Sequence, residues 1–183
     1  MTFRTRRVWA SLRTGRTELL QLLQGIVAVE LMHPSEEFWL VSPWISNIEL
    51  LPDPHGRFRY INPSGAGSLD MVTFLSLLQE AGTRVTVVTL KEGEGSRETE
   101  LFLRSLESAS SSLPYADNLR VLLKQNLEHA KGLLGDTFQI YGSMNFTYRG
   151  LHKNTEIVSF SGDPTDMAWL KDKFEDEYGA WQE

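Results

Sequence analysis

The chain has 183 residues, which is enough for one domain with a buried core but too short for two domains of ordinary size. It contains no cysteine, and this excludes disulfide bonds and thiolate metal sites. No apolar run is long enough to cross a membrane, and no apolar segment of a secretory signal follows the basic N-terminal residues. We therefore expect a cytoplasmic protein without a membrane partner.

The charge is distributed unevenly along the chain. A net charge of −6 argues against a protein that binds nucleic acid by electrostatic attraction alone. Residues 1–16, however, contain no acidic residue and five arginines: Arg4, Arg6, Arg7, Arg13 and Arg16. This basic N-terminal arm is either a solvated terminal segment or a segment that contacts phosphate groups. The sequence predicts a single domain over residues 17–183.

The spacing of apolar residues and the positions of Pro and Gly predict the secondary structure. In chain order we expect a helix at 17–32 capped by Thr17, a strand at 37–45, a long loop at 46–67, a helix at 68–82 capped by Ser68, a strand at 84–90, a helix at 96–110, strands at 118–124, 128–135 and 137–143, a short helix at 144–151, a strand at 155–160 and a helix at 164–183. This order predicts an α/β fold in which a mixed β-sheet is layered between helices.

The aromatic residues divide between predicted core and predicted surface. At least one of Trp39 and Trp44, at the strand 37–45, should lie in the core. Trp169, Phe174 and Trp181 suit the buried side of the amphipathic last helix.

Five types of polar side chain occur between residues 129 and 156 at spacings that can bring them together. His129 and Lys131 are two apart on a predicted strand, so they emerge on the same face. A tight turn returns the next strand antiparallel, which brings Ser143 and Asn145 near the same end. Glu156 belongs to the strand that follows. We therefore expect an imidazole, an ammonium group, a hydroxyl, an amide and a carboxylate at one end of the sheet.

These groups can carry out phosphodiester chemistry without a metal ion. An imidazole can attack phosphorus and leave again, which divides one difficult displacement into two easier ones. Ammonium and amide donors stabilise the charge that builds on the phosphoryl oxygens. A carboxylate can fix the tautomer and orientation of an imidazole. A decorated surface strand is the commoner explanation for an isolated His–Lys pair, but it does not account for the joint pattern.

The segment resembles the phospholipase D superfamily, whose signature is His-x-Lys-x4-Asp followed by Gly-Ser-x-Asn. The chain has H-A-K-G-L-L-G-D at 129–136, G-S-M-N at 142–145 and N-T-E, similar to the family's Asn-x-Glu, at 154–156. The resemblance is strongest over residues 118–160, and the stretches 41–45 and 84–90 resemble two core strands of that fold more loosely. One departure is that the spacing between Asp136 and Gly142 is one residue shorter than is usual in the family.

The resemblance implies a role for each matching residue. His129 is the expected nucleophile and forms a phosphohistidine. Lys131 and Asn145 hold the phosphoryl oxygens, Ser143 supports the pocket, and Glu156 orients His129. Supporting positions, with Asp136 assigned to a turn, are Asp136, Gly142 and Asn154. No metal ion or other cofactor is expected.

The mechanism also needs a second histidine, which acts as a general acid for the leaving oxygen. None of the other histidines (His33, His55 and His152) lies in a copy of the motif. We therefore expect a homodimer in which two copies of the motif form one composite site.

Several substrates and functions stay open. Small single-motif members of the family are typically metal-independent nucleases, which favours a nuclease that acts on DNA rather than RNA. The alternatives are a regulated or inactive nucleic-acid-binding subunit of a larger assembly, and a phospholipid hydrolase or transferase. The stretches W-L-V-S-P-W-I-S and G-S-M-N-F-T-Y-R-G are similar to phospholipase-D-like proteins of bacterial phage-defence gene clusters.

Overall fold

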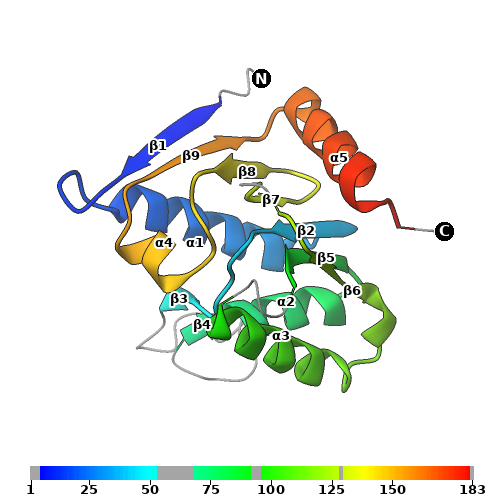
Figure 1. The fold of residues 1–183 in the computed structure, drawn as a ribbon. Helices are drawn as coiled ribbons and strands as arrows, with labels where there is room; N and C mark the ends of the chain where they lie inside the picture. Colours follow the sequence, from blue (N-terminus) through cyan, green and yellow to red (C-terminus); the bar gives the residue numbers. More distant parts are fainter. Residues whose placement is uncertain (1–4, 53–67, 92–95, 128–129, 182–183) are drawn as a thin grey trace.

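The structure is a computed structural model that describes residues 5–52, 68–91, 96–127 and 130–181 (Figure 1). Its centre is a seven-stranded mixed sheet in the order β1-β9-β8-β7-β2-β5-β6. The strands are β1 (Arg6–Ala10), β2 (Glu37–Val41), β5 (Arg84–Leu90), β6 (Leu119–Lys124), β7 (Gly132–Leu134), β8 (Gln139–Gly142) and β9 (Glu156–Ser161). β2, β5 and β6 are parallel to one another, and every other pairing in the sheet is antiparallel. The expected mixed sheet is confirmed.

Helices cover both faces of this sheet. The described helices are α1 (Thr17–Met32), α2 (Met71–Glu80), α3 (Arg97–Ser110), α4 (Tyr148–His152) and α5 (Pro164–Tyr178), with a short 3-10 turn at Ala116–Asn118. α1, α2 and α3 share the larger hydrophobic core, whereas α5 packs on the opposite face (Figure 1). All five residues of β2 are buried because both of its faces are covered, as is usual for the central strands of an α/β protein.

Part of the predicted basic arm is a strand of the sheet. β1 pairs antiparallel with β9, with Arg6 opposite Phe160 and Ala10 opposite Glu156. Val8 and Ala10 are each 1% exposed, whereas Trp9 between them is exposed. This alternation is that of a half-buried edge strand, and five arginines obscured it in the sequence. Because β1 belongs to the same sheet as the rest of the domain, the expected domain boundary at residue 17 is wrong. Arg4 lies outside the described residues.

The region predicted as a loop followed by a helix contains a second, two-stranded sheet. β3 (Glu49–Pro52) pairs antiparallel with β4 (Ser68–Asp70), and residues 53–67 lie outside the described part. Ser68 is therefore in a strand and does not cap a helix. Asp70 is the cap, because its Oδ1 accepts a hydrogen bond of 2.8 Å from the backbone N of Thr73.

The other helices mostly follow their predicted bounds. α1 has the expected extent, but Arg16 rather than Thr17 is its cap residue and no side chain caps it. α5 ends at Tyr178, followed by Gly179 with a φ of +87°.

The aromatic predictions for the last helix are partly wrong. Phe174 is buried with its ring centroid 5.7 Å from that of Trp39, whereas Trp169 is 57% exposed. The buried side of α5 is formed by Leu170 and Phe174, which are four residues apart and so lie on the same face. Trp169 comes one residue before Leu170 and therefore lies on a different face of the helix. Trp181 follows the helix and donates a hydrogen bond of 2.9 Å to the Thr86 hydroxyl. In the described ranges, no helix is both long and apolar enough to cross a bilayer.

Candidate active site

Three of the predicted site residues, Lys131, Ser143 and Glu156, lie together at one edge of the sheet, where several strand ends meet. Strands β7, β8 and β9 form an antiparallel meander, so the start of β7, the end of β8 and the start of β9 lie together. Lys131 directly precedes β7, Ser143 directly follows β8, and Glu156 begins β9. The C-terminal end of β2 reaches the same edge, because Val41 is opposite Gly132. Such strand ends are where ligand crevices form in α/β sheets.

Ser143 and Glu156 form the best-defined polar contact of the site. The Ser143 hydroxyl donates a very short hydrogen bond to Oε2 of Glu156 and accepts one of 3.0 Å from the backbone N of Ile157. Glu156 is 4% exposed, so its carboxylate is held away from bulk water and needs such a donor. The hydroxyl therefore fixes the orientation of the carboxylate.

Lys131 places an amine in the same desolvated region. It is 8% exposed, and its carbonyl oxygen accepts a hydrogen bond of 3.3 Å from the backbone N of Gly142. Burial lowers the pKa of Lys131, and the nearby negative charge of Glu156 opposes this effect. A cation with little water around it interacts strongly with an anionic ligand, so Lys131 suits a role in holding phosphoryl oxygens.

Asn145 is tied to the segment that follows β2. Its Oδ1 lies 3.4 Å from the hydroxyl of Ser42, which is fully buried and also donates a hydrogen bond of 2.8 Å to the carbonyl oxygen of Trp44. Gly150 of α4 packs directly on the backbone of Asn145, and a Cβ atom there would collide with the Asn145 carbonyl oxygen. Ser42 was not among the predicted site residues, because it lay inside the expected strand 37–45, whereas β2 ends one residue before it.

The supporting residues differ in their distance from this edge. Gly142 lies within it, and a side chain there would collide with the carbonyl oxygen of Ile157. Asp136 lies at the opposite end of the sheet, where its Oδ2 accepts a hydrogen bond of 2.7 Å from the backbone N of Glu36. Asp136 is therefore a turn residue, as expected. Asn154 is exposed, and its carbonyl oxygen accepts a hydrogen bond from Arg16. His129 lies outside the described residues.

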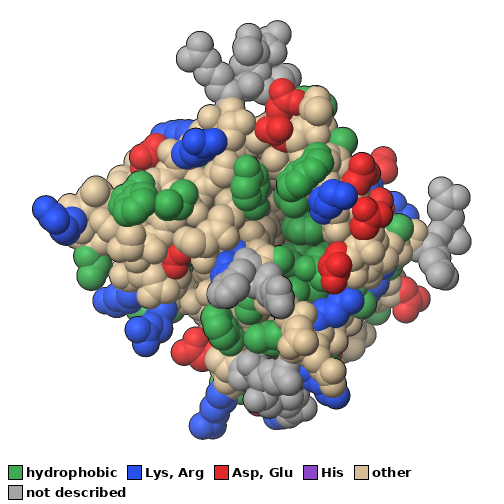
Figure 2. All heavy atoms as spheres, turned by 45° about the horizontal axis from the view of Figure 1, so that its top comes forward, with side chains coloured by type: hydrophobic (Ala, Val, Ile, Leu, Met, Phe, Trp, Pro, Cys, Tyr) green, Lys and Arg blue, Asp and Glu red, His purple; other side chains and the backbone are tan. Residues whose placement is uncertain are grey.

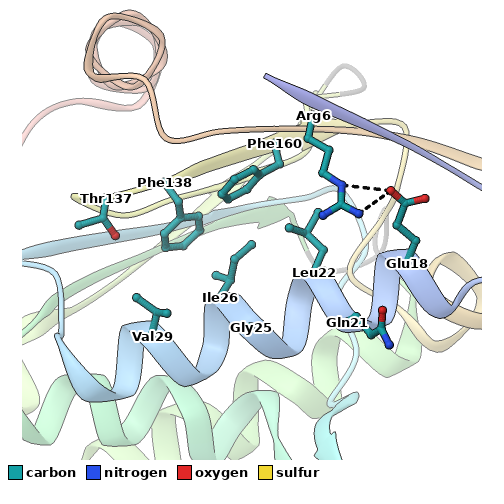
Figure 3. A pocket seen from close by; sticks show the side chains of 10 residues that line it. All are labelled: Arg6, Glu18, Gln21, Leu22, Gly25, Ile26, Val29, Thr137, Phe138 and Phe160. Atoms are coloured by element: carbon teal, nitrogen blue, oxygen red, sulfur yellow. Dashed lines mark hydrogen bonds and ion pairs between the residues drawn. The ribbon is translucent and has the colours of Figure 1, made fainter. Parts of the chain in front are cut away.

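Two of the arginines proposed to contact phosphate groups, Arg6 and Arg16, bind groups of the protein itself. Arg6 forms an ion pair of 2.7 Å with Glu18 at the rim of an apolar hollow of about 370 Å³ (Figure 3). This hollow lies between α1 and the sheet end that carries Phe138 and Phe160, which is opposite the site. Arg16 binds carbonyl oxygens around α4, including that of Leu151 at 3.0 Å. The other two described arginines of the N-terminal arm, Arg7 and Arg13, are exposed.

Comparisons with known proteins indicate the family to which the chain belongs. The family model described as "Cardiolipin synthase, PLD-like domain" matches residues 65–178, more than half of the chain. No curated protein matches the sequence.

Solved structures resemble the chain at low sequence identity. Nuc of Salmonella typhimurium, described as a phospholipase D family member, is 14% identical with a TM-score of 0.60, over 97% of this chain and 95% of that chain. NucT from Helicobacter pylori is 12% identical with a TM-score of 0.57, over 96% and 95%. Phosphatidylserine synthase from Haemophilus influenzae Rd KW20 is 14% identical with a TM-score of 0.60, over 96% of this chain but 38% of that chain. These likenesses show a shared fold.

Proposed function

Because the chain belongs to the phospholipase D superfamily, we propose that it is a metal-independent phosphodiesterase that cleaves nucleic acid through a phosphohistidine intermediate. The observation that carries the proposal is the cluster of Lys131, Ser143 and Glu156 at one edge of the sheet, next to the sequence position of His129. The match in the signature supplies the nucleophile, and Lys131, two residues later in the sequence, is part of the described cluster.

The proposed reaction has two displacements at phosphorus. In the first, an imidazole nitrogen of His129 forms a bond to phosphorus while the bond to the leaving oxygen breaks, and a general acid gives that oxygen a proton. In the second, the general acid, now deprotonated, takes a proton from water as the water oxygen attacks phosphorus, the bond to nitrogen breaks, and a phosphomonoester remains. Lys131 and Asn145 stabilise the charge on the phosphoryl oxygens, and Glu156, held by Ser143, orients the imidazole.

The general acid is best supplied by a second copy of the chain. His33 follows the C-terminal end of α1 and is remote from the site edge, and His55 lies outside the described residues. His152 stacks on Tyr148 with ring centroids 4.7 Å apart. Burial lowers the pKa of His152, as do the charges of Arg16 and Lys153, so it is a weak candidate for a protonated acid. His129 of a second subunit would complete the site.

An exposed apolar face next to the site suits this second copy. Trp9 and Ile157 are cross-strand neighbours on β1 and β9, and Tyr141 lies on β8; they are 56%, 47% and 42% exposed. They lie on the sheet face that α5 covers only in part, and hydrophobic side chains remain exposed there (Figure 2). Exposed apolar patches of this kind mark interaction surfaces.

The decisive experiment is a cleavage assay in EDTA with single- and double-stranded DNA and RNA. We expect cleavage by the wild-type chain and a loss of at least about 100-fold in the His129→Asn variant, because covalent and acid–base catalysis both depend on this imidazole. His33→Asn is the matched control. A requirement for Mg²⁺ together with an active His129→Asn variant refutes the proposal.

The same assay separates the alternatives. Binding without cleavage favours a nucleic-acid-binding subunit, and headgroup release from phospholipid vesicles favours a lipid substrate. A place in a phage-defence assembly and a cytoplasmic location stay predictions.

The dimer has its own test. Light scattering should give twice the 20.8 kDa of the chain. Ile157→Lys should shift the mass toward the monomer and reduce cleavage, because a charge in an apolar interface is unfavourable. A monomeric wild-type enzyme that is fully active removes the shared site.

A further inference from the structure

A groove of about 510 Å³ opens next to Asn145 at the site edge. Three chain segments form it: the turn after β2, which carries Trp44; the start of α3, which carries Arg97; and the segment from Asn145 to α4, which carries Arg149. Because Asn145 lines the groove and belongs to the proposed catalytic set, the groove continues directly from the site.

Hydrogen bonds hold the walls of this groove in place. The backbone N of Ile45 donates to the buried Thr99 hydroxyl at 3.1 Å, which fixes the turn after β2 to the first turn of α3. The backbone N of Ser46 donates to the carbonyl oxygen of Phe146 at 2.9 Å, which fixes the same turn to the segment after Asn145. The groove is therefore built before any ligand arrives, which lowers the free-energy cost of binding.

The chemistry of the lining fits an unpaired nucleotide. Trp39, on the preceding strand, is fully buried in the core. Trp44, in contrast, is 42% exposed and lines the groove, so its indole is accessible to a ligand. Arg97 and Arg149 are exposed, and neither forms an ion pair with a residue in the described ranges. Glu98 also lines the groove and partly offsets their charge. Aromatic faces with nearby arginines are the usual means of holding a single strand.

We propose that this groove binds an unpaired nucleotide adjacent to the scissile phosphodiester, with its base stacked on Trp44 and its phosphates near Arg97 and Arg149. The inference rests on the proposed function and extends it to a substrate class, single-stranded nucleic acid. A base can stack on Trp44 only when it has left a duplex, so a paired strand gains nothing from this surface.

The first test compares two substrates in EDTA: a single-stranded oligonucleotide and bis(4-nitrophenyl) phosphate, a diester with no flanking nucleotide. Trp44→Ala should lower kcat/KM for the oligonucleotide by about 5- to 150-fold relative to the effect on the small diester, as expected for the loss of one stacked base. Trp44→Phe should restore most of this ratio because it keeps an aromatic face. Trp169→Ala, which removes an exposed tryptophan on α5, should leave the ratio unchanged.

The second test addresses the arginines. Arg97→Gln and Arg149→Gln should each lower the affinity of the inactive His129→Asn variant for the oligonucleotide and reduce the slope of log K against log salt by about 0.7, the value for one phosphate contact on a single strand. Arg104→Gln on the exposed side of the same helix is the control and should leave the slope unchanged.

The outcomes distinguish the groove from the function on which it depends. If the wild-type chain hydrolyses neither substrate, the proposed function fails. If it hydrolyses both, but Trp44→Ala leaves the ratio unchanged or lowers both rates equally, the groove is not a nucleotide site. Equal cleavage of duplex and single-stranded oligonucleotides, or headgroup release from phosphatidylglycerol vesicles that depends on Trp44, also overturns the inference.

Discussion

Replacing Thr99 by Val tests how the groove is held together. The Thr99 hydroxyl accepts the hydrogen bond of the Ile45 backbone N at 3.1 Å, and both residues are almost fully buried, with exposed fractions of 1% and 0%. Valine has nearly the same shape but no acceptor, so the substitution leaves a buried N–H without a partner. The same hydroxyl lies 3.1 Å from that of Ser96, but Ser96 keeps its bond to the backbone N of Thr99.

The free energy of unfolding should fall by about 1–3 kcal/mol, which is the usual cost of a buried donor without an acceptor. With a urea dependence of about 2 kcal/mol per M, the midpoint of urea unfolding should fall by roughly 0.5–1.5 M. Thr137→Val is the matched control, because Thr137 is exposed in a turn, and its midpoint should change by less than about 0.3 M. A Thr99→Val midpoint that stays within this control range refutes the reasoning, because it shows that the bond does not fix α3 to the turn after β2.

Two further predictions concern pH. Burial lowers the pKa of Lys131, and the negative charge of Glu156 opposes this effect. Glu156→Gln should therefore lower the pKa of Lys131 further, so that the variant loses its residual diester hydrolysis at a lower pH on the alkaline side of the profile. An unchanged alkaline side of the pH profile contradicts the prediction. Burial raises the pKa of Glu30 above 4.5, so its contribution to stability is complete below pH 4.5 and is lost as pH rises through the folded-state pKa. Glu30→Gln should therefore gain stability over the wild type as pH rises from 4.5 toward neutral, whereas Glu80→Gln, an exposed control, should not; a difference that does not change with pH contradicts this reading.

The predicted site residues come from neighbouring strands of the sequence, whereas the groove residues that were missed come from segments far apart in the sequence. Lys131, Ser143 and Glu156 could be placed together because consecutive antiparallel strands connect them, and short turns determine which strand ends meet. The groove could not be predicted, because Trp44, Arg97 and Arg149 come from three segments whose proximity depends on the order of strands in the sheet. Local patterns contain little information about that order.

The helices and strands show the same difference: those defined by local sequence patterns were predicted, and those defined by distant pairing were missed. The bounds of α1 and β5 match their predictions because periodic apolar residues and nearby Pro or Gly residues define them locally. β1 was missed because its partner is far away in the sequence and its exposed side carries arginines. β4 was missed because Ser68 and Asp70 are both good helix caps, and only the pairing with β3 shows which of them begins the helix.

The pairing of β1 with β9 also affects how the protein is made. The two strands are separated by about 150 residues, and a ribosome adds about 5–20 residues per second, so β1 waits roughly 8–30 s for its partner. During that time an unpaired strand can associate with other nascent chains. Arg6 and Arg7 give this strand two adjacent positive charges, and charged residues on a free strand edge oppose such pairing. Arg6 and Arg7 thus oppose aggregation of the newly made protein, a role separate from any part in binding a substrate.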